Sequence, residues 1–328
     1  SDVEGLEELI APWGYGQLTN VGRRRGYELG QYIRRRYDEL LSDTYNKSEI
    51  YIRSTDSTRT KMTVLTAMAA VYPAVGDIWS QDINWVPVPY ATVPARYDFN
   101  LGNLNCPVFV SEYTTSMFKS TTAMDQYADV IARVSEILNY DISAYPILAY
   151  GIYDLFVSQV RITIFHDILP ELAAASAEAM EIIFGDNNNI DLNHFAGVLL
   201  NEFFTYANTT IAGTDTQRVR IYSAHDINVF ALYAITQATP SIGVPFYASA
   251  FSLELRKVVR TGKYVVLPVY FNPLEDKEVY LEIEGCGSRL CDIDTFYSLT
   301  SQYLLDETTW RTKCEYSDDY EIDTSTID

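Results

Sequence analysis

Two stretches far apart in the chain repeat one local order: a short apolar strand, a polar turn and a helix. Residues 49–52 predict the first strand, and a helix follows over 57–72 until Pro73 closes it. The order returns with a strand at 219–222, a polar turn and a helix over 227–237. Because such units bury their strands in a sheet covered by helices, the pair predicts an α/β sheet built from both ends of the chain.

An earlier helix precedes the first of these units. It begins near Thr19 or Asn20, both of which are residue types that cap helices well. Apolar residues recur on one face at spacings of three and four, at Leu29, Ile33, Tyr37 and Leu40. The arginine runs at 23–25 and 34–36 are expected to lie mostly in solvent.

The middle of the chain is mainly helical in pattern. After a proline-marked extended crossing, helices are predicted at 124–138, 153–165 and 169–184. Strand patterns return later, at 250–255, 264–271 and 279–283, before a helix at 292–304. We therefore expect an α/β fold: a three-layer sheet domain with helices on both faces, formed by residues 1–95 and 206–328. A smaller, mainly helical domain is inserted at 96–205.

The charge of the chain excludes several classes of partner. Lys and Arg number 24 against 44 Asp and Glu, giving a net charge of −20. Such a surface repels phosphate backbones and anionic lipid headgroups, so we expect neither nucleic acid nor a membrane surface as a partner. No run approaches the ~20 apolar residues that span a bilayer, and residues 1–4 do not resemble the start of a signal peptide. If the protein is secreted, its signal has been removed.

Cysteines and glycosylation sequons favour an oxidising compartment. Asn46 and Asn208 each open an Asn-x-Ser/Thr sequon. The cysteines are even in number and lack zinc-site spacing, which predicts two disulfides; they are Cys106, Cys286, Cys291 and Cys314. We expect a secreted, extracellular or lysosomal glycoprotein. The 26 scattered tyrosines suit a packed core, with a homodimer interface as the alternative.

Two polar turns carry the residues that could perform chemistry. Arg53 to Asp56, with Arg59, follows the first strand, and His225 with Asp226 follows the strand at 219–222. Ligands bind at such strand ends, where an arginine grips phosphate oxygens and a His-Asp pair binds an anion and supplies a proton. The bland interpretation, favoured on these residues alone, is that Arg53 pairs with a carboxylate and that His225 and Asp226 cap their helix.

Several segments occur in one order along nearly the whole chain: 14–19 with Gly22, 27–30, 34–37, 51–56 with Arg59-Thr60, and 223–226. In these segments the sequence resembles the histidine acid phosphatases, especially the animal prostatic and lysosomal branch. Weaker similarities lie at 87–89, 92–94, 105–107, 285–286 with Cys291, and Cys314.

The resemblance implies residue roles and disulfide pairs. Arg53 resembles the family's third phosphate-binding arginine, His225 its second histidine, which binds the phosphoryl group, and Asp226 its general acid. Cys106 would pair with Cys314 and Cys286 with Cys291, whereas a third family bridge has no cysteines here. The implied substrate is a phosphomonoester, or a phosphate or sulfate anion, with no cofactor and no metal.

One family feature has no counterpart in the printed residues. The family's nucleophile is a histidine in an Arg-His-Gly-x-Arg-x-Pro motif on the first strand, but His166, His194 and His225 all lie outside such a context. His166 and His194 are expected to be ordinary core or surface residues. The chain as printed is therefore predicted to be inactive alone.

Two explanations remain open. In the first, the protein is an acid phosphatase whose motif-bearing strand is not among the printed residues. In the second, it is a secreted pseudophosphatase with a binding or structural role, an interpretation that Ile227-Asn228, in place of the family's threonine-rich sequence, slightly favours. Losing a central strand would leave buried backbone groups unsatisfied at ~1–3 kcal/mol each, which favours the first explanation.

Overall fold

The computed structural model describes residues 13–14, 16–75, 78–118, 121–158, 167–184 and 191–323. Its parallel sheet has the order β2 (Ala91–Thr92), β1 (Ile50–Ser54), β3 (Val219–Ser223). β1 and β3 pair along their whole length, from Ile50 opposite Val219 to Ser54 opposite Ser223. The prediction that both ends of the chain build one sheet is confirmed.

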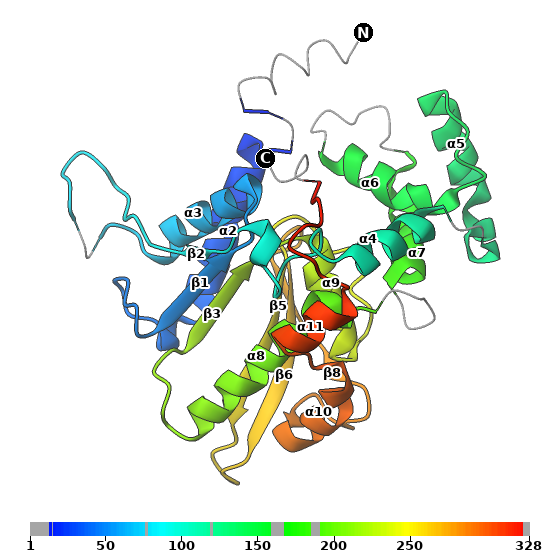
Figure 1. Ribbon diagram of the computed structural model, residues 1–328. Helices are drawn as coiled ribbons and strands as arrows, with labels where there is room; N and C mark the ends of the chain where they lie inside the picture. The colour runs from blue at the N-terminus through cyan, green and yellow to red at the C-terminus, as the bar shows by residue number, and fades with distance from the viewer. Residues whose placement is uncertain are drawn as a thin grey trace.

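A second sheet is antiparallel and lies beside the first (Figure 1). It consists of β5 (Ala250–Lys257), β6 (Tyr264–Asn272) and β7 (Lys277–Tyr280), with β9 (Cys291–Asp292) paired to β6. The strand predicted at 279–283 is divided in two. After β7 the chain leaves this sheet, and β8 (Glu282–Ile283) pairs instead with β4 (Ala238–Thr239).

Two helices, α2 (Asn20–Arg36) and α3 (Thr58–Val71), pack together on the parallel sheet. They approach closely at Gly30, where a Cβ atom would lie 2.1 Å from the carbonyl oxygen of Ala67. The prediction that α2 continues to Leu40 is wrong. It ends at Arg36, and Leu40 is exposed in the 3-10 turn η1 (Asp38–Leu40), because Arg34 binds the carbonyl oxygens of the residues that follow.

The arginine run at the end of α2 also differs from expectation. Only 9% of the Arg36 side chain is exposed, whereas we expected the run to lie mostly in solvent. Its Nε donates to Glu254 Oε1 at 2.6 Å and its Nη1 to Glu278 Oε2 at 2.6 Å. Arg36 therefore ties α2 to β5 and β7 of the antiparallel sheet.

The rest of the described chain is mainly helical. Helices α4 (Pro107–Met117), α5 (Ala128–Leu138), α6 (Ala149–Ser158) and α7 (Leu169–Phe184) gather on one side of the sheets (Figure 1). The 3-10 turns η2 (Ala95–Tyr97), η3 (Thr122–Tyr127) and η4 (Pro146–Leu148) connect this region. The helices predicted at 124–138 and 169–184 are confirmed apart from the η3 turn. α6 begins before the predicted residue 153, and residues 159–166 lie outside the described part of the chain.

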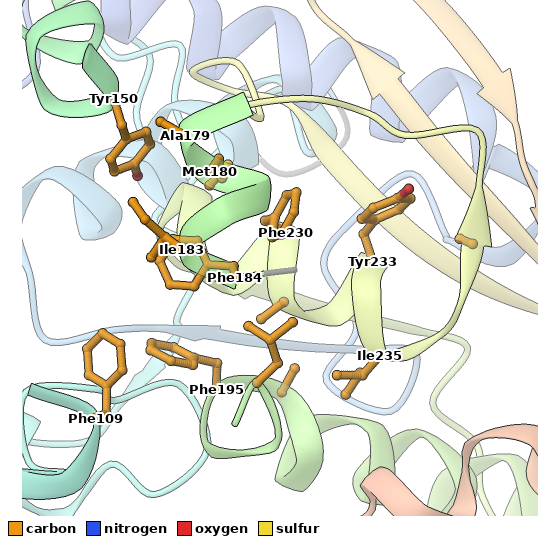
Figure 2. Close-up of a cluster of buried hydrophobic side chains, with 14 of the residues drawn as sticks. Phe109, Tyr150, Ala179, Met180, Ile183, Phe184, Phe195, Phe230, Tyr233 and Ile235 are labelled. Carbon is orange, nitrogen blue, oxygen red and sulfur yellow. The ribbon is translucent and has the colours of Figure 1, made fainter. Parts of the chain in front are cut away.

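The remaining helices are α8 (Asn193–Ile211), α9 (Asp226–Ile235), α10 (Ile293–Thr300) with η5 (Ser301–Tyr303), and α11 (Glu307–Lys313). α8 packs on α9 and crosses residue 205, the predicted end of the inserted domain. The division into domains stays a prediction. Figure 2 shows Phe109, Phe184, Phe195 and Phe230 converging from α4, α7, α8 and α9 in one core.

Two disulfides link the predicted cysteine pairs, Cys106 with Cys314 and Cys286 with Cys291. The first joins the start of α4 to the end of α11 and is completely buried. Among the described helices, none is both long and apolar enough to cross a lipid bilayer. The fold is thus an α/β assembly with a parallel sheet, flanking helices and an inserted group of helices.

Candidate functional site

The two predicted turns meet at the carboxyl ends of adjacent parallel strands. Thr55 N donates to Ser223 O at 3.0 Å, so the turn after β1 lies directly beside the turn after β3. Both open into a cavity of about 2400 Å³, whose lining includes Thr55, Arg59, His225 and Asp226. The structure therefore brings together residues separated by some 170 positions in sequence, as the α/β pattern predicted.

His225 is held between Arg59 and Thr55. Its Nδ1 lies 3.4 Å from Arg59 Nη2, and its Nε2 lies 3.3 Å from Thr55 Oγ1. Because a guanidinium can only donate, Nδ1 must be the acceptor, which leaves the imidazole hydrogen on Nε2. Burial, helped by the charge of Arg59, lowers the pKa of His225 to about 4. The neutral ring can then donate from Nε2 to an oxygen in the cavity.

Asp226 directly follows His225 in the sequence and is the first residue of α9. The Tyr150 hydroxyl donates to Asp226 Oδ2 at 2.6 Å, which fixes the orientation of the carboxyl group. Burial raises the pKa of Asp226, and the nearby charge of Asp154 adds to the rise against the opposing hydrogen bond from Tyr150. A carboxyl group with a raised pKa can carry a proton in mildly acidic solution and donate it.

Arg53 lies behind the cavity. Its Nη2 pairs with Asp98 Oδ1, and both residues are buried. The same carboxylate oxygen accepts from Leu101 N at 2.8 Å. Asp98 and Arg59 line the cavity, whereas Arg53 is absent from its lining. The pairing of Arg53 with a carboxylate, expected under the bland interpretation, is thus present, and a phosphate-binding role for Arg53 stays a prediction.

The same structure supports the capping interpretation of the second turn. His225 is the N-cap residue of α9, and its backbone N–H donates to Asn228 Oδ1 at 3.2 Å. Capping uses the backbone of His225, while its ring faces Thr55 and Arg59. The two interpretations of this turn are therefore compatible.

Three site residues come from a helix and a loop that sequence reasoning did not connect to the site. Tyr150 and Asp154 are four positions apart on α6, so they share one helix face, and both line the cavity. The Tyr247 hydroxyl, from the loop before β5, donates to Asp154 Oδ1. Their i, i+4 spacing was a usable signal, but the helix was predicted to start only at residue 153.

His194, the other described histidine, is not in the site. His194 is buried in α8, and burial lowers its pKa. Its ring nitrogens have no hydrogen-bond partner within the described residues. It lies beside Cys106 and Cys314, but their sulfur atoms bind each other in the disulfide rather than a metal. His166 lies outside the described residues.

Both sequon asparagines are exposed. Asn46 precedes β1, and Asn208 lies in the last turns of α8. Both side chains are thus accessible on the surface, and their glycosylation stays a prediction.

Comparison with known sequences gives consistent matches. The family model described as histidine phosphatase superfamily (branch 2) matches residues 7–164. Prostatic acid phosphatase of Bos taurus is 28% identical over 324 residues, which cover 94% of this chain and 81% of the relative. Lysosomal acid phosphatase of Xenopus laevis is 27% identical over 326 residues, covering 94% and 73%.

Solved structures give the same architecture. The apo phytase of Hafnia alvei superposes with a TM-score of 0.63 at 14% identity, covering 89% of this chain and 88% of that one. The phytase of Citrobacter braakii gives a TM-score of 0.62 at 13% identity, covering 89% of each chain. At these identities the likeness shows a shared fold.

Proposed function

This chain belongs to branch 2 of the histidine phosphatase superfamily, and we propose that it is an acid phosphatase scaffold for metal-free phosphomonoester hydrolysis through a phosphohistidine. In this proposal His225 and Arg59 bind the phosphoryl oxygens, Asp226 protonates the leaving group, and Arg53 contributes as the sequence resemblance implies. The nucleophile is assigned to none of the printed residues. The printed chain alone should therefore bind phosphate without turning it over.

The observation that carries the proposal is the pairing of His225 and Asp226 at one strand end with opposite pKa shifts. A neutral His225 donates a hydrogen bond to a phosphoryl oxygen, and Arg59 adds a positive charge behind it. A protonated Asp226, oriented by Tyr150, can give its proton to the oxygen of the departing alcohol. The role of Asp226 needs a pH low enough to keep its carboxyl group protonated, and that of His225 needs a pH above about 4, as expected of an acid phosphatase.

The general-acid role of Asp226 is tested by how the effect of its substitution on turnover depends on the leaving group. We expect Asp226→Asn in the natural full-length protein to reduce turnover of an alkyl phosphate by about 10²- to 10⁴-fold. The loss on 4-nitrophenyl phosphate should be smaller, because 4-nitrophenolate leaves with less need of a proton. Asp129→Asn, on the exposed surface of α5, is the matched control. Equal losses on both substrates would remove the general-acid role.

The arginines can be separated by a second pair of variants. Arg59→Lys and Arg53→Lys each keep one positive charge but lose the planar, two-pronged donor group. A larger rise in the phosphate dissociation constant for Arg59→Lys would support direct binding by Arg59. A larger rise for Arg53→Lys would support the family role of Arg53 and would require it to leave Asp98.

One observation favours a second candidate function, that of a secreted pseudophosphatase that binds anions. Arg53 pairs with Asp98 and is absent from the cavity lining, and no printed histidine stands in an Arg-His-Gly context. Intact-mass measurement and N-terminal sequencing of the native protein discriminate the two. An Arg-His-Gly segment in the native protein would remove this candidate, whereas phosphate binding by a native protein that starts at Ser1 and shows no turnover would establish it.

We also propose that the protein is a glycoprotein that is secreted or located in the lysosome. Two disulfides and two exposed sequons support this, since both modifications belong to the secretory route. Glycosidase treatment of native protein should lower its mass, and Asn46→Gln with Asn208→Gln should abolish that shift. The homodimer stays a prediction, and size-exclusion chromatography of the native protein would test it.

A further inference from the structure

Three side chains of metal-ligating type converge in the core from three helix ends. Cys106 is the N-cap residue of α4, His194 lies in the first turn of α8, and Cys314 is the C-cap residue of α11. The two sulfur atoms and one imidazole nitrogen all lie within 4.8 Å of one another. All three residues are buried, and none of them belongs to the lining of the cavity at His225. The cluster is therefore separate from the proposed phosphatase site.

The imidazole of His194 lacks a polar partner. Only 4% of the residue is exposed, and neither ring nitrogen has a hydrogen-bond partner within the described part of the chain. A buried polar atom left without a partner is unfavourable, and in a folded protein it points to a bound ion or water or to a role beyond packing. One ring nitrogen faces both sulfur atoms of the cluster. An ion bound between the three atoms would give His194 its missing partner, since a neutral imidazole nitrogen is a common metal ligand.

Contacts other than the disulfide hold α11 against α8. Trp310, one turn before Cys314, donates from its Nε1 to the carbonyl oxygen of His194 at 2.7 Å. Lys313 Nζ donates to Asp191 Oδ2 at 2.9 Å. The buried hydrogen bond fixes the backbone at the histidine itself, and the ion pair adds a link nearer the surface. His194 and Cys314 therefore stay close together when the disulfide is open.

Aromatic packing holds the start of α4 against α8 in the same way. Phe109 lies three residues after Cys106, and Phe195 directly follows His194. Their rings pack edge to face with centroids 4.2 Å apart, as Figure 2 shows. Both rings belong to the main hydrophobic core. Opening the disulfide thus leaves all three ligands within reach of one ion.

The donor set and its burial favour zinc. Two thiolates and an imidazole suit zinc, whereas magnesium and calcium prefer oxygen ligands. A divalent ion with two thiolates and a neutral imidazole has no net charge, which lowers the cost of burial; copper(I) would leave one negative charge. Zn–S bonds of about 2.3 Å and Zn–N bonds of about 2.0–2.1 Å place tetrahedral donors about 3.5–3.8 Å apart. Small side-chain rotations reach that spacing from the present cluster, and water takes the fourth position.

We propose that Cys106, His194 and Cys314 form a redox-controlled zinc site, in which the disulfide and the zinc-bound dithiolate are alternative states. A dithiol reductant supplies two electrons: the bond between the cysteine sulfurs breaks, each sulfur takes a proton from the reductant, and the two sulfurs of the reductant form a disulfide. Zn²⁺ then displaces both protons as the thiolates bind it. Oxidation by another disulfide reforms the bridge, reduces that disulfide to two thiolates and frees the ion. α4 and α11 thus stay linked in both states.

Zinc binding is tested on the printed chain after removal of metals. One sample stays oxidised. The other is reduced with tris(2-carboxyethyl)phosphine, which becomes a phosphine oxide with oxygen from water, and is then freed of reductant under nitrogen. We expect the reduced chain to bind one Zn²⁺ and its thermal midpoint to rise and saturate, with no such rise in the oxidised chain. Equal rises in both samples, or none in the reduced one, would overturn the proposal.

Two further measurements identify the ligands. Co²⁺ in place of Zn²⁺ should give sulfur-to-metal charge-transfer absorption and the intense visible bands of a tetrahedral ion. Zn²⁺ should slow alkylation of Cys106 and Cys314 by roughly tenfold or more, because bound thiolates are poor nucleophiles. Cys286 and Cys291 are the internal control, since no third ligand lies beside them among the described residues. Equal slowing of all four cysteines, or of none, would contradict the assignment.

Variants test the histidine. His194→Gln removes the imidazole and should weaken zinc binding by the reduced chain about a hundredfold or more. His225→Gln, which removes a partly buried imidazole elsewhere, is the matched control and should bind zinc like the reduced wild type. If the reduced chain does not stay folded, recovery of native tryptophan fluorescence on refolding with Zn²⁺ decides instead. Recovery in the wild type but not in His194→Gln would support the site, whereas equal recovery in both would exclude His194 as a ligand and overturn it.

Discussion

Removing the long disulfide should destabilise the protein more than removing the short one. The Cys106–Cys314 bridge spans 208 positions, whereas Cys286–Cys291 spans 5. A bridge limits the unfolded chain in proportion to the logarithm of the loop that it closes, which gives about 5 kcal/mol for the long loop and about 2 kcal/mol for the short one at 25 °C. The difference of about 3 kcal/mol is the quantity to measure.

The two double-alanine variants, one for each bridge, can be compared directly. Each bridge is removed by replacing both cysteines with alanine, so the same number of sulfur atoms is lost. The long bridge lies at the start of α4 and the end of α11, next to buried Trp310, and the lost packing there adds to the expected cost. The predicted order of the two variants therefore follows from loop length and from burial alike.

Urea unfolding followed by tryptophan fluorescence measures the free energy of unfolding for each variant. If the free energy of unfolding falls with urea concentration at a similar slope for both variants, the two expose a similar surface area on unfolding. If the variant that lacks the Cys286–Cys291 bridge lost as much free energy of unfolding as the variant that lacks the Cys106–Cys314 bridge, the loop-entropy argument would be refuted. Reduction with dithiothreitol should lower the stability of the variant that keeps only the long bridge by about 5 kcal/mol, and that of the variant that keeps only the short bridge by about 2 kcal/mol.

Three further changes test the charges and packing. Burial lowers the pKa of His225 in the folded protein to about 4 from 6.5. The contribution of neutral His225 to the free energy of unfolding is therefore full above pH 6.5 and is lost as the pH falls toward 4. Over that range, urea unfolding should show the wild type losing up to about 3 kcal/mol more stability than His225→Gln. Gly30→Ala should cost about 1–3 kcal/mol because its new Cβ meets the α3 backbone, whereas Gly151→Ala meets nothing within 4 Å and should be neutral or stabilising in thermal unfolding. Arg36→Met should cost about 3–5 kcal/mol and exposed Arg35→Met less than about 1 kcal/mol, checked by the same urea titration.

The parts of the fold that follow from local patterns could be predicted from the sequence. The strand and helix around each polar turn depend on neighbouring residues, and β1 and β3 pair as adjacent parallel strands because both are apolar and followed by helices. α7 has the predicted bounds since its apolar periodicity is unbroken from Leu169 to Phe184.

The contacts that complete the site could not be predicted in the same way. Tyr150 meets Asp226 across 76 positions, and Arg53 meets Asp98 across 45. Neither pair has a local signal, because their approach depends on how the α6 region and the η2 loop pack over the sheet. The burial of Arg36 has the same origin: its partner Glu254 lies 218 positions away.

A single physical cause sets the protonation of both central groups in opposite directions. Removing His225 and Asp226 from water disfavours the charged form of each, which lowers the pKa of the histidine and raises that of the aspartate. Burial therefore favours the neutral form of both groups, in which each is a hydrogen donor. As the pH rises, Asp226 loses its proton and becomes an anion that repels phosphate; below about pH 4, His225 becomes charged. Burial, the largest cause of both shifts, thus favours in each group the protonation state that the proposed acid phosphatase function requires.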